Sequence, residues 1–565
     1  MNQQGLYEPI ECLLHTPLSR RALLRLLGAG ATGFYLSRVQ GAATAATGDP
    51  RASPIDRSLG ETAPRAFSGD QPERPHRALW DKRAYLAARG GLPPVEKSVP
   101  LVVVGGGIAG LTTAYLLRRH GPVVLEQGAR FGGNARGESW RGLDYAIGAA
   151  YFTAPEEGSP LRRLYGELGV DKIWRKAPGG HPVALEGRLV GDFWQGRSAP
   201  ADRAQFRALA RYFHRLYQEE GGLVYPEIPA YSRARRRHID ALDRISFRRH
   251  VESVAGGPLH PHLVTAFEHY CWSSFGASFS EVSAAAGLNF FAAEFGDILV
   301  TPGGNAAIAE RLYARLDAAL PPGHLQAGAL VVDVRVAGDG VEVSYEDAAG
   351  ALHRLRTRAA VLACPKFVAA RLVDDLEPER LEAIRRLSYR AYLVANVLLT
   401  RKLPDSLYDL YLLGGGATDD KDIKAAAERQ KATDVVFGTY AHPDARSSIL
   451  TLYRPLPYDG ARPALLADDA YDRYRAEFEA QLQETVLPLL DVRPEDVADL
   501  RLARWGHPLP VAATGLIADG TVDRLRRPLR DRVFFVQQDN WALPAIETAT
   551  AEALHWAPRI ARLLA

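Results

Sequence analysis

Cysteine is scarce in this 565-residue chain, which has only Cys12, Cys271 and Cys364. Their spacing shows neither pairs nor a metal-type cluster, so a disulfide framework and a metal site are not expected. We interpret Cys271 and Cys364 as small buried apolar residues. A large excess of charge of one sign is also lacking, because the formal net charge is only +3. The arginine-rich residues 233–237 therefore indicate a solvated helix face, and no nucleic-acid partner is expected.

A long apolar run is lacking near the N-terminus, where residues 26–36 fall short of the about 20 residues that a membrane span needs. This run follows Arg20-Arg21 and precedes the small residues Ala43-Thr44-Ala45. The order is similar to a twin-arginine signal, so residues 1–45 are predicted to be a signal peptide. The prediction implies the Tat translocase as a partner and a periplasmic or otherwise exported protein. A basic amphipathic helix is the alternative.

Residues 101–126 carry, in order, the features of a dinucleotide-binding site. Residues 101–104 form an apolar run typical of a buried parallel strand, and Gly105, Gly107 and Gly110 follow with the spacing Gly-x-Gly-x-x-Gly. The first glycine allows a tight turn, the second lets the backbone approach a pyrophosphate, and the third lets the next helix pack on the strand. We predict that this helix extends to about residue 120.

The helix N-terminus and the next strand complete this predicted site. Backbone N–H groups at Ile108 and Ala109 are placed to bind phosphate, and the partial positive charge of the helix end favours it. Residues 123–125 predict a second strand that leads into Glu126. This acid lies 21 residues after Gly105, where a carboxylate accepts hydrogen bonds from ribose hydroxyls.

The length of the chain exceeds a single typical core, so two domains with extensions are expected. Residues 46–98 are rich in Pro, Arg, Gly and Ser and predict an extended arm or linker, with one short helix at about residues 77–88. Helical spacing then dominates, for example at residues 201–217 and 239–254. Strand-like runs and Gly-Gly turns return near residue 299.

The simplest architecture is one α/β nucleotide domain in three pieces, with two inserts that form a second domain. The strand predicted at residues 533–536 and the helix at 545–554 repeat the strand-to-helix order of the start. The three pieces of the nucleotide domain are residues 99–155, 299–365 and 501–565. The second domain is predicted from a helical insert, residues 156–298, and an insert of sheet and helices, residues 366–500.

A Gly-Gly pair lies soon after Glu126, within residues 130–136, Arg-Phe-Gly-Gly-Asn-Ala-Arg. This sequence resembles the flavin-dependent amine oxidase and phytoene (carotenoid) desaturase superfamily, and the similarity covers residues 99–565 in overall order. The resemblance implies a Rossmann-like FAD-binding domain of the GR2 type with an inserted α+β substrate domain. NAD is a less favoured cofactor, because the later flavin-type segments would then have no purpose.

Three further segments carry the resemblance: residues 147–151 beside the flavin ring, residues 301–304 on the loop back to the flavin domain, and residues 534–549 as the closing flavin motif. The closing motif offers an acid to the ribityl hydroxyls and a helix N-terminus to the flavin. The FAD-binding residues that the resemblance implies are Gly105, Gly107, Ile108, Ala109, Gly110, Glu126, Gln127, Arg130, Gly132, Gly133, Asn134, Gly148, Ala149, Ala150, Tyr151, Val331, Asp539, Ala545 and Ile546.

Two departures from the family pattern refine this prediction. Many amine oxidases place a lysine near flavin N5, but residues 389–399 contain none, and a C-terminal cysteine for covalent attachment is also missing. FAD is therefore expected to be noncovalent, and a dehydrogenase that passes electrons to a cytochrome c or quinone is favoured over an oxidase that uses oxygen. Within the superfamily, the acid placement and residues 504–507 are most similar to spermidine dehydrogenase-type flavoproteins.

The resemblance implies an FAD-dependent oxidoreductase of the amine dehydrogenase or oxidase kind, with hydride transfer from the CH–NH group of an amine or polyamine to give an imine. Tyr151 and Trp541 are candidate aromatic walls of the catalytic site, with ordinary core packing as the alternative. His507 is a candidate base or hydrogen-bond donor, or else a structural histidine. Glu294 and Asp297 are candidates to attract a polyamine, or else surface carboxylates.

Two other functions remain open from the sequence. One is a desaturase-like flavoprotein that acts on a long apolar substrate, which the missing lysine suits and the predicted export suits less. The other is a noncatalytic flavin-fold protein that binds a partner, because complete cofactor motifs demonstrate binding and not turnover.

Overall fold

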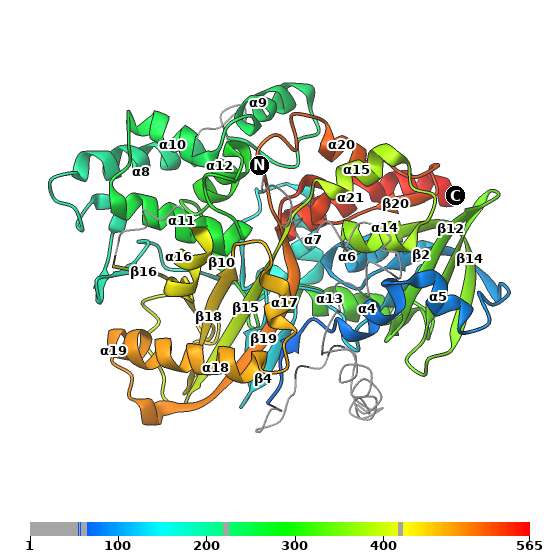
Figure 1. Cartoon of the computed structure of the whole chain (residues 1–565), viewed down its shortest axis with the longest axis horizontal. Helices are drawn as coiled ribbons and strands as arrows, with labels where there is room; N and C mark the ends of the chain where they lie inside the picture. The colour runs from blue at the N-terminus through cyan, green and yellow to red at the C-terminus, as the bar shows by residue number, and fades with distance from the viewer. Residues whose placement is uncertain (1–54, 56, 58–64, 219–224, 416–421) are drawn as a thin grey trace, which may run out of the picture.

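Two large sheets organise the computed structural model, which describes residues 55, 57, 65–218, 225–415 and 422–565. A seven-stranded sheet lies on one side of the molecule and an eight-stranded sheet on the other (Figure 1). None of the helices in these ranges has the length and apolar character of a membrane span. The predicted signal peptide, residues 1–45, lies outside the described residues.

The seven-stranded sheet has a parallel centre, in which β2, β3, β14 and β20 run side by side. Both faces of β2 are buried: Leu101 and Val103 belong to one core, and Val102 and Val104 to another. This two-sided burial explains the uninterrupted apolar run, because a parallel strand covered on both faces needs no polar alternation. The strands of this sheet are β2 (Lys97–Val104), β3 (Val123–Glu126), β11 (Leu325–Ala327), β12 (Leu330–Ala337), β13 (Gly340–Glu346), β14 (Leu352–Leu362) and β20 (Val533–Phe535).

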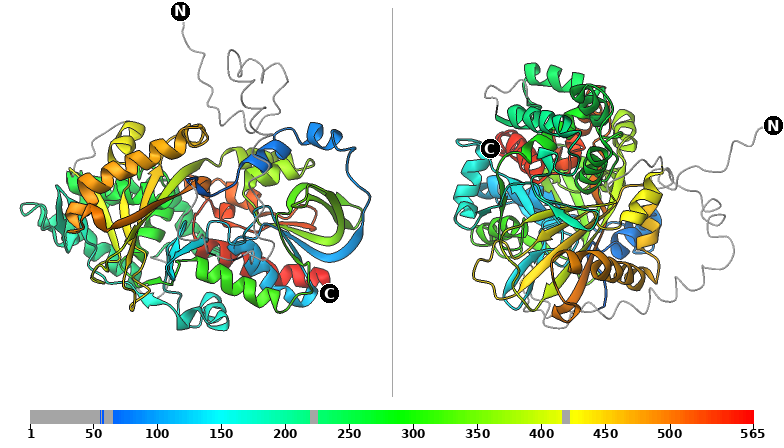
Figure 2. Two further views of the ribbon diagram at one scale, coloured as in Figure 1. Left: turned by 90° about the horizontal axis from the view of Figure 1, so that it is seen from below. Right: turned by 90° about the vertical axis from the view of Figure 1, so that its left-hand side faces the viewer.

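Helices cover one face of this sheet, and Figure 2 shows them as a layer beside it in the left-hand view. They are α6 (Ile108–Leu116), α13 (Ala306–Asp317) and α21 (Ile546–Leu564). The sequence predicts that the first of these helices extends to about residue 120. In the structure α6 ends at Leu116 and is followed by a short 3-10 helix, η2 (Arg118–His120). On the other face, α14 (Lys366–Leu372) and α15 (Pro378–Arg385) pack with β12 and β13.

The eight-stranded sheet is mainly antiparallel and separates two cores. Alternate residues of β15 face opposite sides, so Leu393 and Ala395 join one core and Tyr392 and Val394 join the other. The strands of this sheet are, in spatial order, β1 (Ser68–Gly69), β19 (Val497–Pro510), β15 (Tyr389–Leu399), β18 (Ser448–Leu456), β17 (Asp434–Phe437), β16 (Asp409–Gly414), β8 (Val183–Leu185) and β9 (Arg188–Val190). The helix α18 (Ala470–Gln481) covers the first core.

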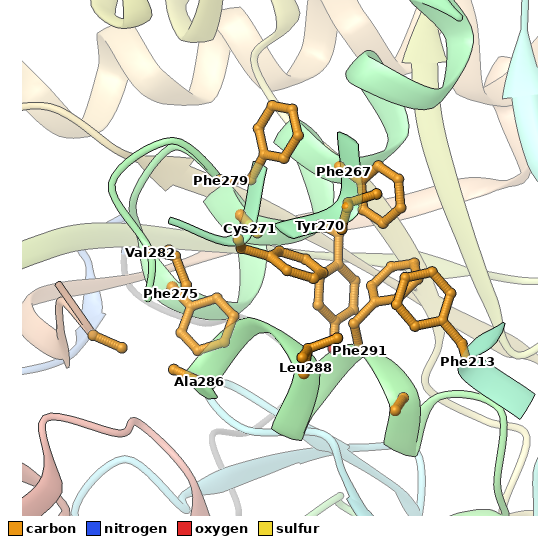
Figure 3. Packing of buried hydrophobic residues seen from close by; sticks show 14 of the residues in the cluster. Phe213, Phe267, Tyr270, Cys271, Phe275, Phe279, Val282, Ala286, Leu288 and Phe291 are labelled. Atoms are coloured by element: carbon orange, nitrogen blue, oxygen red, sulfur yellow. The ribbon is translucent and has the colours of Figure 1, made fainter. Parts of the chain in front are cut away.

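A helical layer forms the rest of the second domain and has an aromatic core (Figure 3). Tyr270 from α11 and Phe291 from α12 meet there with their ring centroids 4.7 Å apart. The single helix predicted at residues 239–254 is divided in two, because Ser246 caps a new helix by accepting from the backbone N–H of Arg249. The layer comprises α8 (Arg203–Gln218), α9 (Arg233–Asp243), α10 (Phe247–Ala255), α11 (Pro261–Phe275) and α12 (Ala284–Ala293).

Shorter elements connect these layers. The strands are β4 (Gly137–Trp140), β5 (Leu143–Ala146), β6 (Tyr151–Thr153), β7 (Arg175–Lys176) and β10 (Ile298–Val300). The helices are α4 (Glu73–Leu79), α5 (Lys82–Ala87), α7 (Pro160–Leu168), α16 (Ile423–Gln430), α17 (Ala461–Leu465), α19 (Leu487–Leu489) and α20 (Thr521–Arg526). The remaining short helices are η3 (Val170–Lys172), η4 (Phe193–Gln195), η5 (Leu482–Val486), η6 (Pro494–Asp496) and η7 (Gln538–Trp541).

The described part of the N-terminal arm is docked on the protein, which corrects the prediction of an extended linker. The strand β1 pairs with β19, and two helices, α4 and α5, replace the one expected. Arg74 donates to the Glu346 carboxylate at 3.0 Å, and Arg57 forms ion pairs with Asp144 and Glu310. These long-range contacts hold a segment whose composition alone indicates no fold.

One predicted domain boundary is also wrong. Residues 501–510 were assigned to the nucleotide domain, but they belong to β19 of the eight-stranded sheet. The strand continues past the expected boundary because it pairs with β15 along almost its whole length, from Tyr389 with Pro510 to Leu399 with Val497.

Candidate active site

The turn after β2 places its three glycines in different surroundings. A methyl group on Gly105 would lie 2.8 Å from the carbonyl oxygen of Ala363, and one on Gly110 would lie 1.9 Å from the carbonyl oxygen of Gly105. A methyl group on Gly107 would meet nothing closer than 3.6 Å outside its chain neighbours. Packing within the protein therefore requires glycine at the first and third positions. At Gly107 the space is left for a ligand that approaches the backbone.

A cavity of about 1580 Å³ extends from this turn across both domains. All the predicted FAD-binding residues line it except Gly110. This glycine instead packs the start of α6 against the backbone of Gly105. The helices α6 and α21 both begin at its wall, and their N-cap residues, Gly107 and Ala545, supply no side-chain cap. The cavity thus offers two sets of helix N–H groups and a glycine turn, which fit the phosphates and the ring end of a flavin dinucleotide.

Two acids of the predicted FAD site are held in place by the backbone. The Glu126 carboxylate accepts from the N–H groups of Gly106 and Gly128, each at 2.7 Å. Asp539 accepts from the N–H of Lys366 at 2.9 Å and from the Tyr389 hydroxyl. Burial raises the pKa of both carboxyl groups, and these donors oppose the rise. Each oxygen of Glu126 accepts one of these bonds and retains a lone pair, and both bonds to Asp539 go to Oδ2, which leaves Oδ1 for a ribose or ribityl hydroxyl.

The segment 147–151, expected beside the flavin ring, is fixed by donors from the eight-stranded sheet. The Trp505 indole donates to the Ile147 carbonyl at 2.7 Å, and the Tyr453 hydroxyl donates to the Gly148 carbonyl at 2.6 Å. Tyr408 donates to the carbonyl of Ala150 at 3.3 Å. The substrate domain therefore positions the wall of the FAD cavity, which couples the two domains at the place where they meet.

Carboxylates line the part of the cavity beyond this segment. Glu294 accepts hydrogen bonds from the hydroxyls of Tyr151 and Tyr270, each at 3.2 Å. Asp434 accepts from Ser273 at 2.9 Å and from Thr433 at 2.7 Å. Burial raises the pKa of both acids to about 7, although these hydroxyls act in the opposite direction. Neither acid forms an ion pair with a lysine or arginine of the described ranges.

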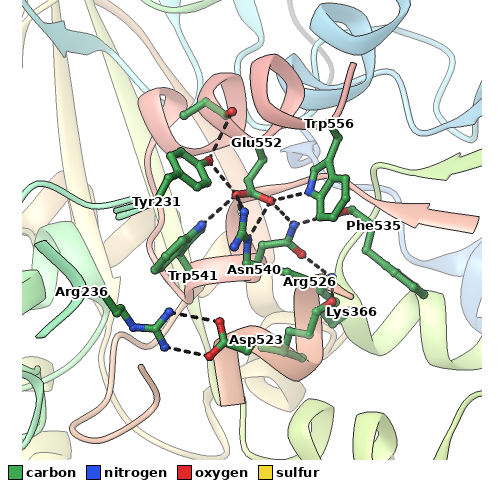
Figure 4. Close-up of polar contacts among 12 residues, drawn as sticks. Tyr231, Arg236, Lys366, Asp523, Arg526, Phe535, Asn540, Trp541, Glu552 and Trp556 are labelled. Atoms are coloured by element: carbon green, nitrogen blue, oxygen red, sulfur yellow. Dashed lines mark hydrogen bonds and ion pairs between the residues drawn. The ribbon is translucent and has the colours of Figure 1, made fainter. Parts of the chain in front are cut away.

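The three predicted catalytic residues are separated by the structure. Tyr151 and His507 line the main cavity, and the His507 ring lies 4.4 Å from the ring of Phe367. Trp541 does not line this cavity, so the prediction that it forms a substrate wall is wrong. It is buried with its indole N–H donated to Glu552 at 2.8 Å (Figure 4). The short helix η7 directs Asp539 to the cavity and turns Trp541 towards α21.

The structure also separates the two acids and the two cysteines that the sequence analysis singles out. Glu294 lines the cavity, whereas Asp297 lies near the surface and pairs with Lys176 at 2.6 Å. Cys271 is buried as predicted, but Cys364 is half-buried and lines the main cavity.

The sequence analysis does not identify several residues that line the main cavity. Asp434 begins β17, and an acid at the start of that apolar run is the sequence signal that could have found it. Tyr392, Tyr453 and Trp505 face the cavity from three neighbouring strands, which only the register of the sheet reveals. Asp70 and other residues of the N-terminal arm also line the cavity.

Fold and site together define a dinucleotide-dependent oxidoreductase with a separate substrate domain. The sequence profile "Flavin containing amine oxidoreductase" matches residues 108–537, and the chain belongs to this family. The predicted α/β fold with a Rossmann-like FAD-binding domain and an inserted substrate domain is confirmed, and the protein is an FAD-dependent oxidoreductase.

Individual relatives are distant. Oxidoreductase PigB from Serratia sp. (strain ATCC 39006) is 22% identical over 81% of this chain and 74% of its own length. A redesigned putrescine oxidase is similar in structure, with a TM-score of 0.60 and 16% identity over 83% of this chain and 99% of that one. Cyclohexylamine oxidase from Brevibacterium oxydans IH-35A has a TM-score of 0.59 and 17% identity over 82% and 99%. At such identities the structural likeness shows the fold alone.

Proposed function

We propose that this protein is an exported amine oxidoreductase that binds FAD noncovalently and recognises its substrate as a cation. The observation that carries the proposal is the pair of carboxylates, Glu294 and Asp434, that line the cavity beside the segment 147–151 without an ion-pair partner in the described ranges. Aromatic side chains surround them, and tyrosine faces attract ammonium groups. Two of the proteins with a similar structure, putrescine oxidase and cyclohexylamine oxidase, are named for amine substrates.

Glu294 is the residue that we assign to the substrate nitrogen. Its ionised carboxylate binds the ammonium, and it then accepts the proton that must leave before the nitrogen lone pair is available. A carboxyl group with a pKa of about 7 exchanges this proton readily near neutral pH. The hydroxyls of Tyr151 and Tyr270 fix the orientation of the carboxylate. When bound, FAD supplies the acceptor for a hydride from the carbon next to nitrogen.

The charge of the site distinguishes this proposal from the alternative with a long apolar substrate. Such a substrate would leave Glu294 and Asp434 without a compensating group, and burial of unpaired acids is costly. An amine substrate supplies the missing cation. The same argument favours an enzyme over a noncatalytic partner-binding protein, because the acids lie inside the cavity and not on the surface.

The finer parts of the proposal rest on the sequence. Export through the twin-arginine pathway depends on residues 1–45, and the likeness to spermidine dehydrogenase-type flavoproteins depends on short motifs. A cytochrome c or quinone acceptor is supported by the fact that no lysine of the described residues lines the main cavity.

Anaerobic reduction tests the proposal directly. The purified protein, expressed from about residue 46 and loaded with FAD, is mixed without oxygen with monoamines, diamines and polyamines, and the flavin absorbance is followed. We expect bleaching by at least one amine, and a loss of most of the rate in Glu294→Gln. Asp297→Asn is the matched control, because that acid is already paired with Lys176. A flavin that no amine bleaches would overturn the proposed function and leave the cofactor assignment in place.

A further inference from the structure

A second cavity of about 320 Å³ lies beside the main one, on the side of the helical layer. The two share Tyr151, Tyr270 and Glu294 in their walls, so the acid that we assign to the substrate nitrogen stands at their junction. A substrate whose amine reaches Glu294 from the FAD side can therefore extend its other end into the second cavity.

Aromatic rings form much of the wall of this second cavity. The ring centroids of Trp194 and Phe295 lie 5.8 Å apart, and those of Tyr151 and Tyr408 lie 6.1 Å apart. Tyr411 adds a further ring, 6.1 Å from Tyr270. A cage of this kind suits an alkyl chain that ends in a cationic group, because ring faces attract cations and ring edges pack against methylenes.

One acid of this cage has an oxygen atom that no donor of the described residues satisfies. Asp409 on β16 lines the second cavity, and its Oδ1 atom is buried without a hydrogen-bond donor among the described residues. Burial, together with the nearby Asp434 and Glu294, raises the pKa of Asp409 well above its usual value. A carboxylate kept unsatisfied beside a cavity costs stability unless a ligand compensates it.

The register of the sheet explains how these acids come together. Asp409 lies opposite Val436, and Tyr411 lies opposite Asp434 in the antiparallel pair of β16 and β17. Asp409 and Asp434 are therefore diagonal neighbours on one face of the sheet, with their side chains on the order of 7–8 Å apart. This face therefore presents two carboxyl groups from neighbouring strands.

No positive group of the cavity wall neutralises Asp409. The ammonium of Lys176 is paired with Asp297 at 2.6 Å. Burial lowers the pKa of His181, the histidine of this wall, to about 4, so its ring is neutral at neutral pH. Asp409 also forms no ion pair with the lysines and arginines of the described ranges.

We propose that the second cavity binds a distal ammonium group of the substrate at Asp409, so that the protein prefers a diamine or longer polycation over a monoamine of equal length. This inference rests on the proposed function and adds a specificity site to it. Glu294 receives the reacting nitrogen, the aromatic cage holds the methylene chain, and Asp409 pairs with the nitrogen at the far end.

Matched substrates test this site. The rate of anaerobic flavin reduction is measured for n-alkylamines and for α,ω-diamines of the same chain lengths, in the holoenzyme and in Asp409→Asn. The wild type should show a ratio of kcat/KM that favours at least one diamine over its matched monoamine. Asp409→Asn should lower this ratio about 10- to 100-fold, the range for loss of one charge-assisted hydrogen bond. Asp409→Glu keeps the charge and should restore part of it.

Controls separate the possible failures. Asp523→Asn changes an acid that is already paired with Arg236 and lines neither cavity, and it should leave the diamine-to-monoamine ratio unchanged. Circular dichroism and FAD content confirm that each variant is folded. Equal kcat/KM values for matched diamines and monoamines in the wild type, or an unchanged ratio in folded Asp409→Asn, would overturn the second-cation site and leave the amine oxidoreductase standing. No reduction by any amine would overturn both.

Discussion

Replacing Gly107 by valine should weaken FAD binding strongly and leave the fold intact. The backbone at Gly107 has φ −78° and ψ −175°, which a valine adopts without strain. Its first side-chain carbon would meet no atom closer than 3.6 Å outside the chain neighbours, so the branched side chain would project into the main cavity. There it would cover the N–H groups at the start of α6, where we expect the pyrophosphate.

The expected magnitude follows from the hydrogen bonds that are blocked. A charge-assisted hydrogen bond contributes about 1.5–3 kcal/mol. Loss of about 3 kcal/mol, equal to one strong bond or two weak ones, raises the dissociation constant of FAD about 150-fold. Gly110→Val should behave differently, because even its first added carbon would overlap the Gly105 carbonyl oxygen at 1.9 Å. That variant should fail to fold.

The assay is a titration of the apoprotein with FAD, followed by flavin fluorescence, together with the thermal midpoint of each apoprotein. Gly107→Ala is the control of intermediate size and should weaken binding less than Gly107→Val. The reasoning would be refuted by a folded Gly107→Val protein that binds FAD with the wild-type dissociation constant. A stable, normally folded Gly110→Val protein would refute the second half of it.

The remaining predictions concern the substrate side and the arm. kcat/KM for amines should rise with pH through about 7, because Glu294 must be ionised to bind an ammonium and its pKa is raised to about 7; Glu294→Gln should flatten this part of the profile. Tyr151→Phe should raise KM for the amine, because it removes a hydrogen-bond donor to Glu294. Trp541→Phe should leave kcat unchanged. It should lower the free energy of unfolding, measured by urea denaturation, by about 1–3 kcal/mol, because Glu552 loses a buried donor. Asp70→Ala should speed FAD release in a stopped-flow exchange, since Asp70 accepts from the backbone N–H of Gly506 and fastens the arm that lines the main cavity.

The FAD side of the site was predictable because its information is local. Gly105, Gly107 and Glu126 lie within one strand, turn, helix and strand, so their spacing in sequence fixes their spacing in the fold. The structure places these residues around one cavity, as the motif predicts. Trp541 was misplaced for a related reason: only Asn540 separates it from Asp539, but the tight helix η7 directs the two side chains to opposite sides.

The arm shows a limit of composition as evidence. Its Pro, Gly and Arg content predicts an extended linker, and nothing nearby in the sequence contradicts that. Arg57, Asp70 and Arg74 nevertheless hold it through ion pairs with acids and an arginine that lie more than two hundred residues further along the chain, namely Glu310, Arg504 and Glu346. Arginine is suited both to solvent and to bidentate carboxylate contacts, so only the tertiary structure distinguishes the two uses.

The substrate side was hidden because it depends on the register between strands. Each of β15, β16, β17 and β18 shows an ordinary strand pattern, in which one tyrosine or aspartate has little meaning by itself. Pairing aligns Tyr411 with Asp434, and Asp434 with Tyr453, so that single polar residues from three strands become one lined surface. A shift of any strand by one residue would turn its polar side chain to the opposite face. Substrate recognition in this protein is therefore a property of strand alignment, whereas cofactor recognition is a property of one local motif, and the two are joined where Tyr453 donates to the carbonyl of Gly148.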